Sequence, residues 1–196
     1  MWALVEDNSI TKIINKPKAM VIGDVRHSKN IFSFRWTNEE REAIGIYEVV
    51  IDNSNKKDEA YYINTNQSFD FADGIATASY GSAIAKDLDD KNATDENGVE
   101  LNPVVVIDGL KTKHKKIIKN QASELLAPTD WHVIKSTDVA EYSVPSAVST
   151  FRTNVRTRSN EMETAIDNAS DVDALASLYV YTDGERPLGE WPVLEG

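Results

Sequence analysis

The clearest pattern along the chain is a narrow apolar stripe between residues 144 and 168. The large apolar residues of this segment are Val148, Phe151, Val155, Met162 and Ile166, spaced by three, four, seven and four positions. On an α-helix these positions share one narrow face at close to a heptad period. Pro145 suits the first helical turn, where its missing N–H costs no hydrogen bond. The pattern predicts a helix of about six turns that packs against one neighbour along a seam.

A second helical pattern lies upstream, from Leu110 to Leu126. One face of it holds Leu110, His114, Ile117, Ile118, Gln121 and Leu125, while lysines at 111, 113, 115, 116 and 119 fill the rest of its first half. This periodicity is typical of a helix with one packed side.

The charges of the helix predicted between residues 144 and 168 (the stripe helix) oppose the helix dipole, which favours acidic residues near the N-terminus. Arg152, Arg156 and Arg158 lie in its N-terminal half, and Glu161, Glu163 and Asp167 lie toward its C-terminus. An antiparallel pair explains this order, because it places the lysines beside the acidic end and Glu124 beside Arg152 and Arg156. We therefore predict an antiparallel helix pair within the chain. A seam between copies of the chain, as in a trimer, is the alternative.

The N-terminal half has the short alternating segments of a β-rich domain. Candidate strands are residues 2–5, 10–15, 19–22, 31–34, 46–51, 61–64, 68–72 and 75–80. Hairpin turns are predicted at Glu6–Ser9 and at Asp73-Gly74, where glycine accepts a positive φ. The segment Thr37–Glu40 is a capping box for a short helix that ends at Gly45.

An acidic, weakly apolar segment, residues 86–103, separates this half from the helices. We interpret it as a linker, and its carboxylates do not have the spacing of a calcium loop. Residues 104–107 have a short buried-strand pattern that could pair with the first sheet. The prediction is an α+β fold with a β-rich domain over 1–85, a linker over 86–103 and a mainly helical domain over 104–196.

The segments around the stripe helix complete this picture. Pro128 is expected to end the first helix, so that Trp131, Val133 and Ile134 fold back on its end. Ser170 is expected to cap a last short helix, with apolar residues at 172, 175 and 178 facing inward. The tail over 179–196 contains Trp191 and Leu194, and it either docks on its own domain or inserts into a partner.

Composition narrows the functional classes. The chain of 196 residues has no cysteine and a net charge of −11, with its one basic cluster between Lys111 and Lys119. This charge argues against nucleic-acid binding, which needs clustered Lys and Arg. We find no apolar run long enough for a membrane span and no pattern of a secretion signal at the N-terminus.

No catalytic motif stands out in the sequence. His27, His114 and His132 lie in three different segments, without a nucleophile turn, a phosphate-binding glycine loop or a zinc-protease motif. We therefore expect neither an enzyme nor a metal or cofactor site. The aromatic residues Trp36, Tyr61, Tyr62 and Tyr80 could form a sugar platform, although buried strand aromatics are the simpler interpretation.

Two segments resemble proteins of tailed bacteriophages. Leu125–Trp131 (LLAPTDW), followed by Phe151-Arg152 and by Val172–Leu175 (VDAL), resembles the C-terminal module of phage tail assembly chaperone-like proteins. The segment Trp36–Tyr47 (WTNEEREAIGIY) is similar to a module near the front of tail-fibre-associated proteins, notably of marine phages. The acidic linker and the Pro-Leu-Gly-Glu-Trp-Pro tail depart from both.

The resemblance implies a non-enzymatic protein that attaches to phage tail or tail-fibre proteins through protein–protein contacts. It would be assembled in the host cytoplasm and retained in the virion tail, or act as a transient chaperone that is absent from the particle. A receptor- or carbohydrate-binding tip is a further alternative, and homo-oligomers fit the seam. The candidate partner-binding residues are Phe151, Val155, Met162, Ile166, Trp131, Trp191 and Leu194.

Overall fold

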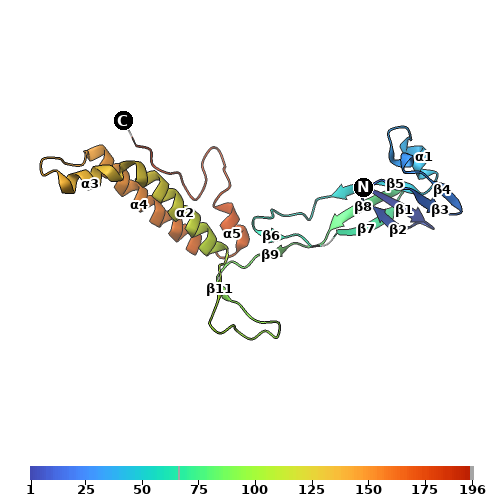
Figure 1. The fold of residues 1–196 in the computed structure, drawn as a ribbon, viewed down its shortest axis with the longest axis horizontal. Coiled ribbons are helices and arrows are strands. Elements are labelled where there is room, and N and C mark those ends of the chain that lie inside the picture. Colours follow the sequence, from blue (N-terminus) through green and yellow to red (C-terminus); the bar gives the residue numbers. More distant parts are fainter. Residues whose placement is uncertain (66, 195–196) are drawn as a thin grey trace. The chain divides into compact units, whose positions relative to one another are not determined.

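A computed structural model of the chain describes residues 1–65 and 67–194 and confirms the α+β class. The chain divides into two compact units, Met1–Ile84 and Ala85–Gly196. Unit 1 is built from strands, and unit 2 contains the long helices (Figure 1). Each unit is described by itself below.

A curved five-stranded sheet forms the centre of unit 1. Its strands are β1 (Trp2–Glu6), β2 (Ser9–Ile14), β5 (Ile46–Asp52), β7 (Gln67–Ala72) and β8 (Ile75–Tyr80), in the order β2-β1-β5-β8-β7. The β5–β8 pair is parallel, and the other neighbours are antiparallel. Apolar side chains are buried on both faces of this sheet, around Leu4 and Ile46 on one face and around Ala3 and Ala76 on the other.

The predicted tight turns are confirmed. Asp7 and Asn8 have φ values of 49° and 62°, and Asp73 and Gly74 have φ values of 51° and 78°. Two positive φ values in succession are the signature of the two-residue turn whose twist matches the flanking strands. Local turn chemistry therefore sets the pairing of β1 with β2 and of β7 with β8.

Unit 1 also contains smaller elements. They are β3 (Met20–Ile22), β4 (Val25–His27), the 3-10 helix η1 (Lys29–Phe32), α1 (Asn38–Glu42) and the strand β6 (Tyr62–Ile63). The predicted strand at residues 31–34 is wrong, because Ser28 caps a 3-10 turn that places Ile31 and Phe32 in the core. The capping box of α1 is confirmed, since Thr37 and Glu40 each accept a backbone N–H of the other.

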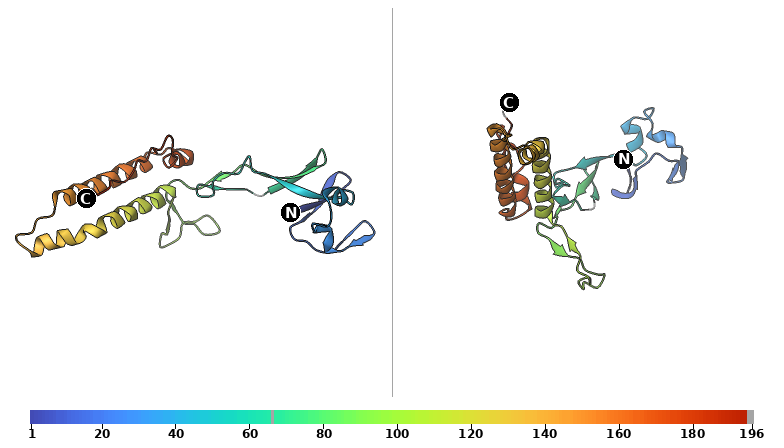
Figure 2. Two further views of the ribbon diagram at one scale, coloured as in Figure 1. Left: turned by 90° about the horizontal axis from the view of Figure 1, so that it is seen from above. Right: turned by 60° about the vertical axis from the view of Figure 1, so that its left-hand side comes forward.

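Unit 2 consists of an antiparallel helix pair with shorter elements at both ends. These are β10 (Lys91–Asn92), β11 (Val106–Ile107), α2 (Leu110–Leu126), η2 (Ala127–Thr129), α3 (Asp130–Asp138), α4 (Ser146–Asp167) and α5 (Val172–Ser177). The strand β9 (Ile84–Ala85) pairs with β6. Helices α2 and α4 lie side by side in opposite directions (Figure 2), as the sequence predicted.

Three local expectations for unit 2 are corrected. Pro128 does not turn the chain back; it sits in η2, through which α2 continues into α3. The cap of α5 is Asp171 and not Ser170, because the Asp171 carboxylate accepts the Ala174 N–H. The segment 104–107 is exposed, and its strand β11 pairs with β10 and not with the sheet of unit 1.

Candidate interaction surfaces

The predicted seam of α4 is filled within the chain. Val155, Met162 and Ile166 are fully buried and Phe151 is 7% exposed, with Phe151 and Val155 packed against Ala122 of α2. Because these four side chains already have neighbours inside unit 2, they are not free to meet another protein. The alternative of a seam between copies is not needed to explain the stripe.

Ser159 fills the gap of seven positions in the apolar pattern. Its side chain is buried, and its hydroxyl donates to the Glu163 carboxylate at 3.3 Å. With Ser159 included, the buried positions of α4 recur every three or four residues along the helix, whereas the apolar residues alone leave a gap of seven. The apolar pattern missed Ser159 because a small polar residue can be buried when its hydroxyl has a hydrogen-bond partner.

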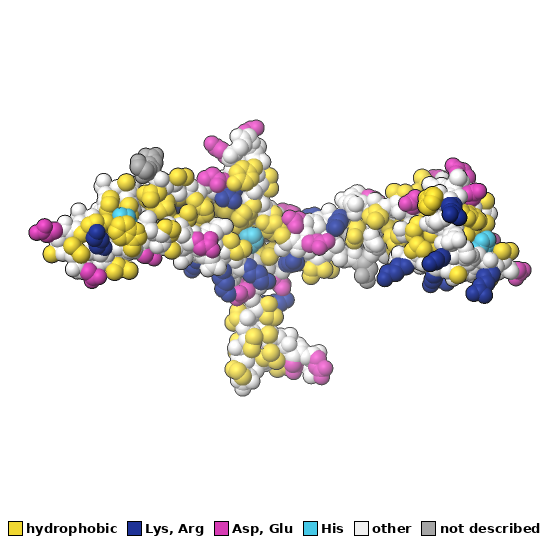
Figure 3. Space-filling model, turned by 45° about the horizontal axis from the view of Figure 1, so that its top comes forward, with side chains coloured by type: hydrophobic (Ala, Val, Ile, Leu, Met, Phe, Trp, Pro, Cys, Tyr) yellow, Lys and Arg dark blue, Asp and Glu magenta, His cyan; other side chains and the backbone are white. Residues whose placement is uncertain are grey.

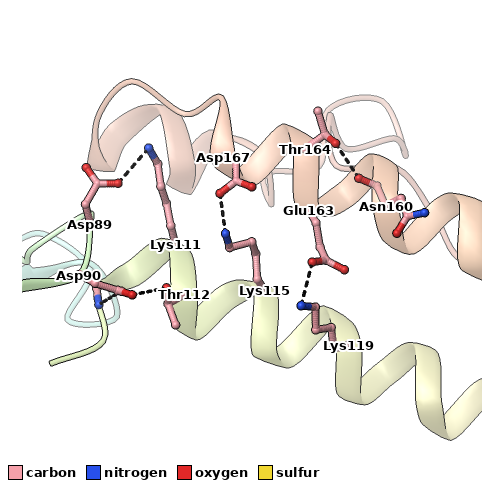
Figure 4. Close-up of polar contacts among 11 residues, drawn as sticks. Asp89, Asp90, Lys111, Thr112, Lys115, Lys119, Asn160, Glu163, Thr164 and Asp167 are labelled. Atoms are coloured by element: carbon pink, nitrogen blue, oxygen red, sulfur yellow. Dashed lines mark hydrogen bonds and ion pairs between the residues drawn. The ribbon is translucent and has the colours of Figure 1, made fainter. Parts of the chain in front are cut away.

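The reversed charges of α4 meet the lysines of α2, as predicted. Lys115 pairs with Asp167 at 2.7 Å and Lys119 with Glu163 at 3.3 Å (Figure 4). The hydrogen bond to Asp167 raises the pKa of Lys115 above its ordinary value. Each exposed pair contributes at most about 1 kcal/mol, so the pairs select the antiparallel orientation more than they stabilise it.

Arg152 has different partners from those expected. Its guanidinium donates to the Leu126 carbonyl at 2.9 Å and to the Thr129 hydroxyl at 2.6 Å, and it pairs with Asp130 at 2.8 Å. The expected partner Glu124 is exposed. Arg152 is buried and holds the η2 junction against α4, so its role is to fix the end of the helix pair.

The tail docks on its own unit through Leu188 and Trp191. Leu188 is buried, and the Trp191 ring packs beside Phe151 and Val155 while its indole N–H donates to Gln121 at 3.1 Å. Leu194 at the end of the described tail is 39% exposed. Of these two candidate residues, Trp191 therefore has an intrachain role, and a partner role for Leu194 stays a prediction.

Trp131 lies on the surface, which corrects the expectation that it folds back on the end of the first helix. It is 52% exposed and stacks on His132 with ring centroids 3.7 Å apart. The His132 ring also hydrogen-bonds the Tyr142 hydroxyl, and the Lys135 ammonium lies 4.4 Å from the Tyr142 ring. With Val133 and Ile134 also exposed, α3 presents a mixed aromatic and apolar surface.

The segment predicted as a linker folds into a hairpin arm, residues 91–107, that belongs to unit 2. Strands β10 and β11 pair antiparallel, and Thr94 pairs with Glu100 near the turn. Six aliphatic side chains on this arm are 37–62% exposed: Val99, Leu101, Val104, Val105, Val106 and Ile107. In Figure 3 apolar side chains run along the arm, with acidic ones near its tip. The arm is therefore an exposed apolar feature of unit 2.

The base of the arm is fixed to the first turn of α2. Asp90 accepts the Gly109 N–H at 2.8 Å and the Thr112 hydroxyl at 2.9 Å, and these hydrogen bonds hold the pKa of Asp90 below its usual 3.8. Lys111 pairs with Asp89 at 3.2 Å. The arm is therefore presented by an ordered base and does not hang on a loose linker.

Gly109 is required by this close approach. A Cβ at this position would lie 2.4 Å from the Asp89 carbonyl and 2.6 Å from the Leu88 oxygen. Such distances are too short for any non-bonded carbon contact, so a larger residue would push the arm away from α2.

Unit 1 has a basic surface that the sequence pattern did not reveal. Between residues 9 and 36, six exposed cations, Lys12, Lys16, Lys18, Arg26, Lys29 and Arg35, accompany one acidic residue, Asp24, giving a formal charge of +5. None of the six has an ion pair with a described residue, and Figure 3 shows basic side chains along one margin of unit 1. Phe34 in the same segment is 94% exposed. The cations are too far apart in sequence to read as a cluster.

The described residues contain neither a cluster of metal-ligand side chains nor a membrane-spanning helix. Across residues 1–65 and 67–194, no three His, Asp or Glu side chains converge as they would around a metal ion. Within the same ranges, no helix combines the length and apolar character needed to cross a membrane. The chain matches no family model, no curated protein and no solved structure.

Proposed function

We propose that the chain is a non-enzymatic structural or assembly protein of a phage tail or tail fibre, and that it acts through protein–protein contacts. The observation that carries this proposal is the hairpin arm, residues 91–107. Its six exposed aliphatic side chains stand on a base that is anchored to α2. A contiguous exposed apolar surface of this kind is typical of a protein-docking site.

The phage context comes from the resemblance of Trp36–Tyr47 and Leu125–Trp131 to tail-associated proteins. In the structure these segments have roles in the fold: the first forms the capped α1 and the start of β5, and the second forms the η2 junction held by Arg152. A protein of this type would be assembled in the host cytoplasm and carried in the virion. Its partners would be tail or fibre proteins.

Particle analysis tests this proposal. We expect mass spectrometry of purified virions to detect the chain, and a Val104→Asp/Val106→Asp variant to be lost from particles while it stays abundant in infected cells. Detection in cells but not in particles would instead support a transient chaperone. A chain that copurifies with no tail or fibre protein at any stage of infection would refute the proposal.

Binding of carbohydrate or a receptor at α3 is a second candidate function. The supporting observation is the exposed Trp131 ring, which His132, Tyr142 and Lys135 hold in place. An exposed aromatic face beside polar groups suits stacking against a sugar. Quenching of tryptophan fluorescence by host surface polysaccharide, lost in Trp131→Ala, would support it, and equal quenching in that variant would exclude it. The platform considered from the sequence lacks support, since Tyr62 is buried.

A further inference from the structure

The hairpin arm lacks an interior of its own. Every residue from 91 to 107 is exposed except Ala93, which is partly buried. A two-stranded hairpin in water is only marginally stable and normally packs on a third strand or a helix. The arm is therefore incomplete by itself, even though its base is anchored to α2.

The outer edge of β11 is unusually open to strand pairing. The run Val104–Ile107 holds four aliphatic residues and no charge, while natural proteins usually protect exposed edges with charged side chains, bulges or prolines. Only Pro103, just before the run, limits the edge at one end. Both faces of this short ribbon are also apolar, so a neighbour that adds a strand would cover side chains and backbone together.

We propose that the neighbour is a second copy of the chain, whose β11 pairs antiparallel with the first about a two-fold axis. This inference rests on the proposed function of the arm as a docking site and names its partner. The two arms would form a four-stranded sheet in the order β10-β11-β11-β10, with Val105 of the two copies opposite each other and Val104 of each copy opposite Val106 of the other. A two-fold interface uses the same surface twice, so one exposed edge supplies both sides.

Charge selects the antiparallel arrangement. The tip of the arm carries Asp95, Glu96 and Glu100, so a parallel pair would place two acidic tips together. The antiparallel pair places each acidic tip toward the base of the other arm. There, Asp87, Asp89 and Asp108 are already paired with Lys91, Lys111 and Lys116, while Lys113 on the first turn of α2 is exposed. Attraction between the acidic tip and this lysine accompanies the burial of the aliphatic side chains.

The exposed area of the chain is large enough for such an interface. The chain exposes 13046 Å² at a mass of 21.8 kDa. Two separate compact proteins, each of half this mass, would together expose about 11,000 Å². The excess, on the order of 2,000 Å² for one chain, is larger than the ~800 Å² that each partner buries in a standard protein–protein interface. An arm without a core is one source of this excess.

Sedimentation velocity of the purified full chain tests the proposal. We expect the wild-type chain to dimerise reversibly and Val104→Asp/Val106→Asp to raise the dimer dissociation constant about 100-fold or more, because each carboxylate would be buried without a partner. The matched control is Val21→Asp/Val25→Asp, which changes two valines that are 60% and 58% exposed on β3 and β4. Circular dichroism checks that both variants keep the helical content of the wild type.

Cross-linking tests the arrangement of the two arms. The chain has no cysteine, so Val105→Cys introduces a single thiol in each copy, at the centre of the proposed pair. We expect rapid disulfide formation between two Val105→Cys copies under mild oxidation, and little between two Val99→Cys copies. Lys113→Glu should weaken the dimer and Glu96→Lys in the same chain should restore it.

Two results would overturn the inference: a wild-type chain that stays monomeric, or a dimer that survives the arm substitutions. The proposed function has a separate readout. If the purified chain is monomeric but the arm variant is still lost from virions, the arm binds another tail protein and only the self-pairing is refuted. If the arm variant is retained in virions, the docking role itself fails.

Discussion

Replacing Arg152 tests the helix pair most directly, because its guanidinium joins α4 to the η2 junction. It contacts the Leu126 carbonyl, the Thr129 hydroxyl and the Asp130 carboxylate within 3 Å. Arg152→Met keeps most of the apolar stem and removes all three polar contacts. The substitution therefore isolates the polar network from the packing of the side chain.

The expected loss of stability depends on how the polar partners of Arg152 are satisfied after the substitution. The Asp130 side chain is 54% exposed, so water replaces the lost cation. The Thr129 hydroxyl still donates to the Leu126 carbonyl at 2.8 Å. The cost is therefore below the 3–5 kcal/mol of breaking a fully buried pair, and near the ~1.5–3 kcal/mol of a hydrogen bond to a charged group. We expect the free energy of unfolding of unit 2 to fall by about 2–3 kcal/mol.

Urea unfolding followed by far-ultraviolet circular dichroism measures this change, since the long described helices all lie in unit 2. Arg156→Met is the matched control: this arginine is exposed on the same helix, and its guanidinium contacts the Arg152 carbonyl one turn earlier. We expect a loss below about 0.5 kcal/mol for the control. Equal losses of stability in the two variants would refute the inference that Arg152 holds the η2 junction against α4.

Three further outcomes follow from the structure. Gly109→Ala should force the arm from α2, at a cost of about 1–3 kcal/mol, and speed amide exchange over residues 87–112. His114 hydrogen-bonds the Tyr179 hydroxyl, and burial lowers its pKa below the ordinary 6.5. The folded state therefore favours the neutral ring, so unit 2 should be most stable above pH 6.5 and lose stability as the pH falls toward the folded-state pKa. His114→Asn should flatten this pH dependence in urea unfolding. Val155→Asp places an unpaired carboxylate in the fully buried seam and should abolish the helical signal of a monomer.

Each of these outcomes has its own control. His27→Asn, in unit 1, should leave the pH dependence of unit 2 unchanged. Val139→Asp changes a valine that is 45% exposed and should preserve the helices. A Val155→Asp variant that keeps its helicity and loses only self-association would restore the seam between copies. Unchanged exchange at the arm base in Gly109→Ala would contradict the close approach at Gly109.

The sequence by itself determined the elements whose causes are local. The capping box of Thr37 and Glu40, the turn at Asp73-Gly74 and the length of α4 all depend on residues within a few positions of one another. The antiparallel pairing was also accessible, because the lysines of α2 and the acidic end of α4 allow only one favourable orientation. Helical period and charge order depend only on the order of residues in the sequence, so they can be recognised without knowing the tertiary contacts.

Only the tertiary structure decided which neighbour each surface meets. The apolar pattern of α4 could not distinguish α2 from another copy, and it could not show that Ser159 and Arg152 belong to the buried face. The pattern of Val104–Ile107 is that of a buried strand, yet this strand is exposed on the arm. Burial depends on what the rest of the chain brings alongside a segment. A short apolar run has the same sequence whether its partner lies in the same molecule or, as we propose for the arm, in a second one.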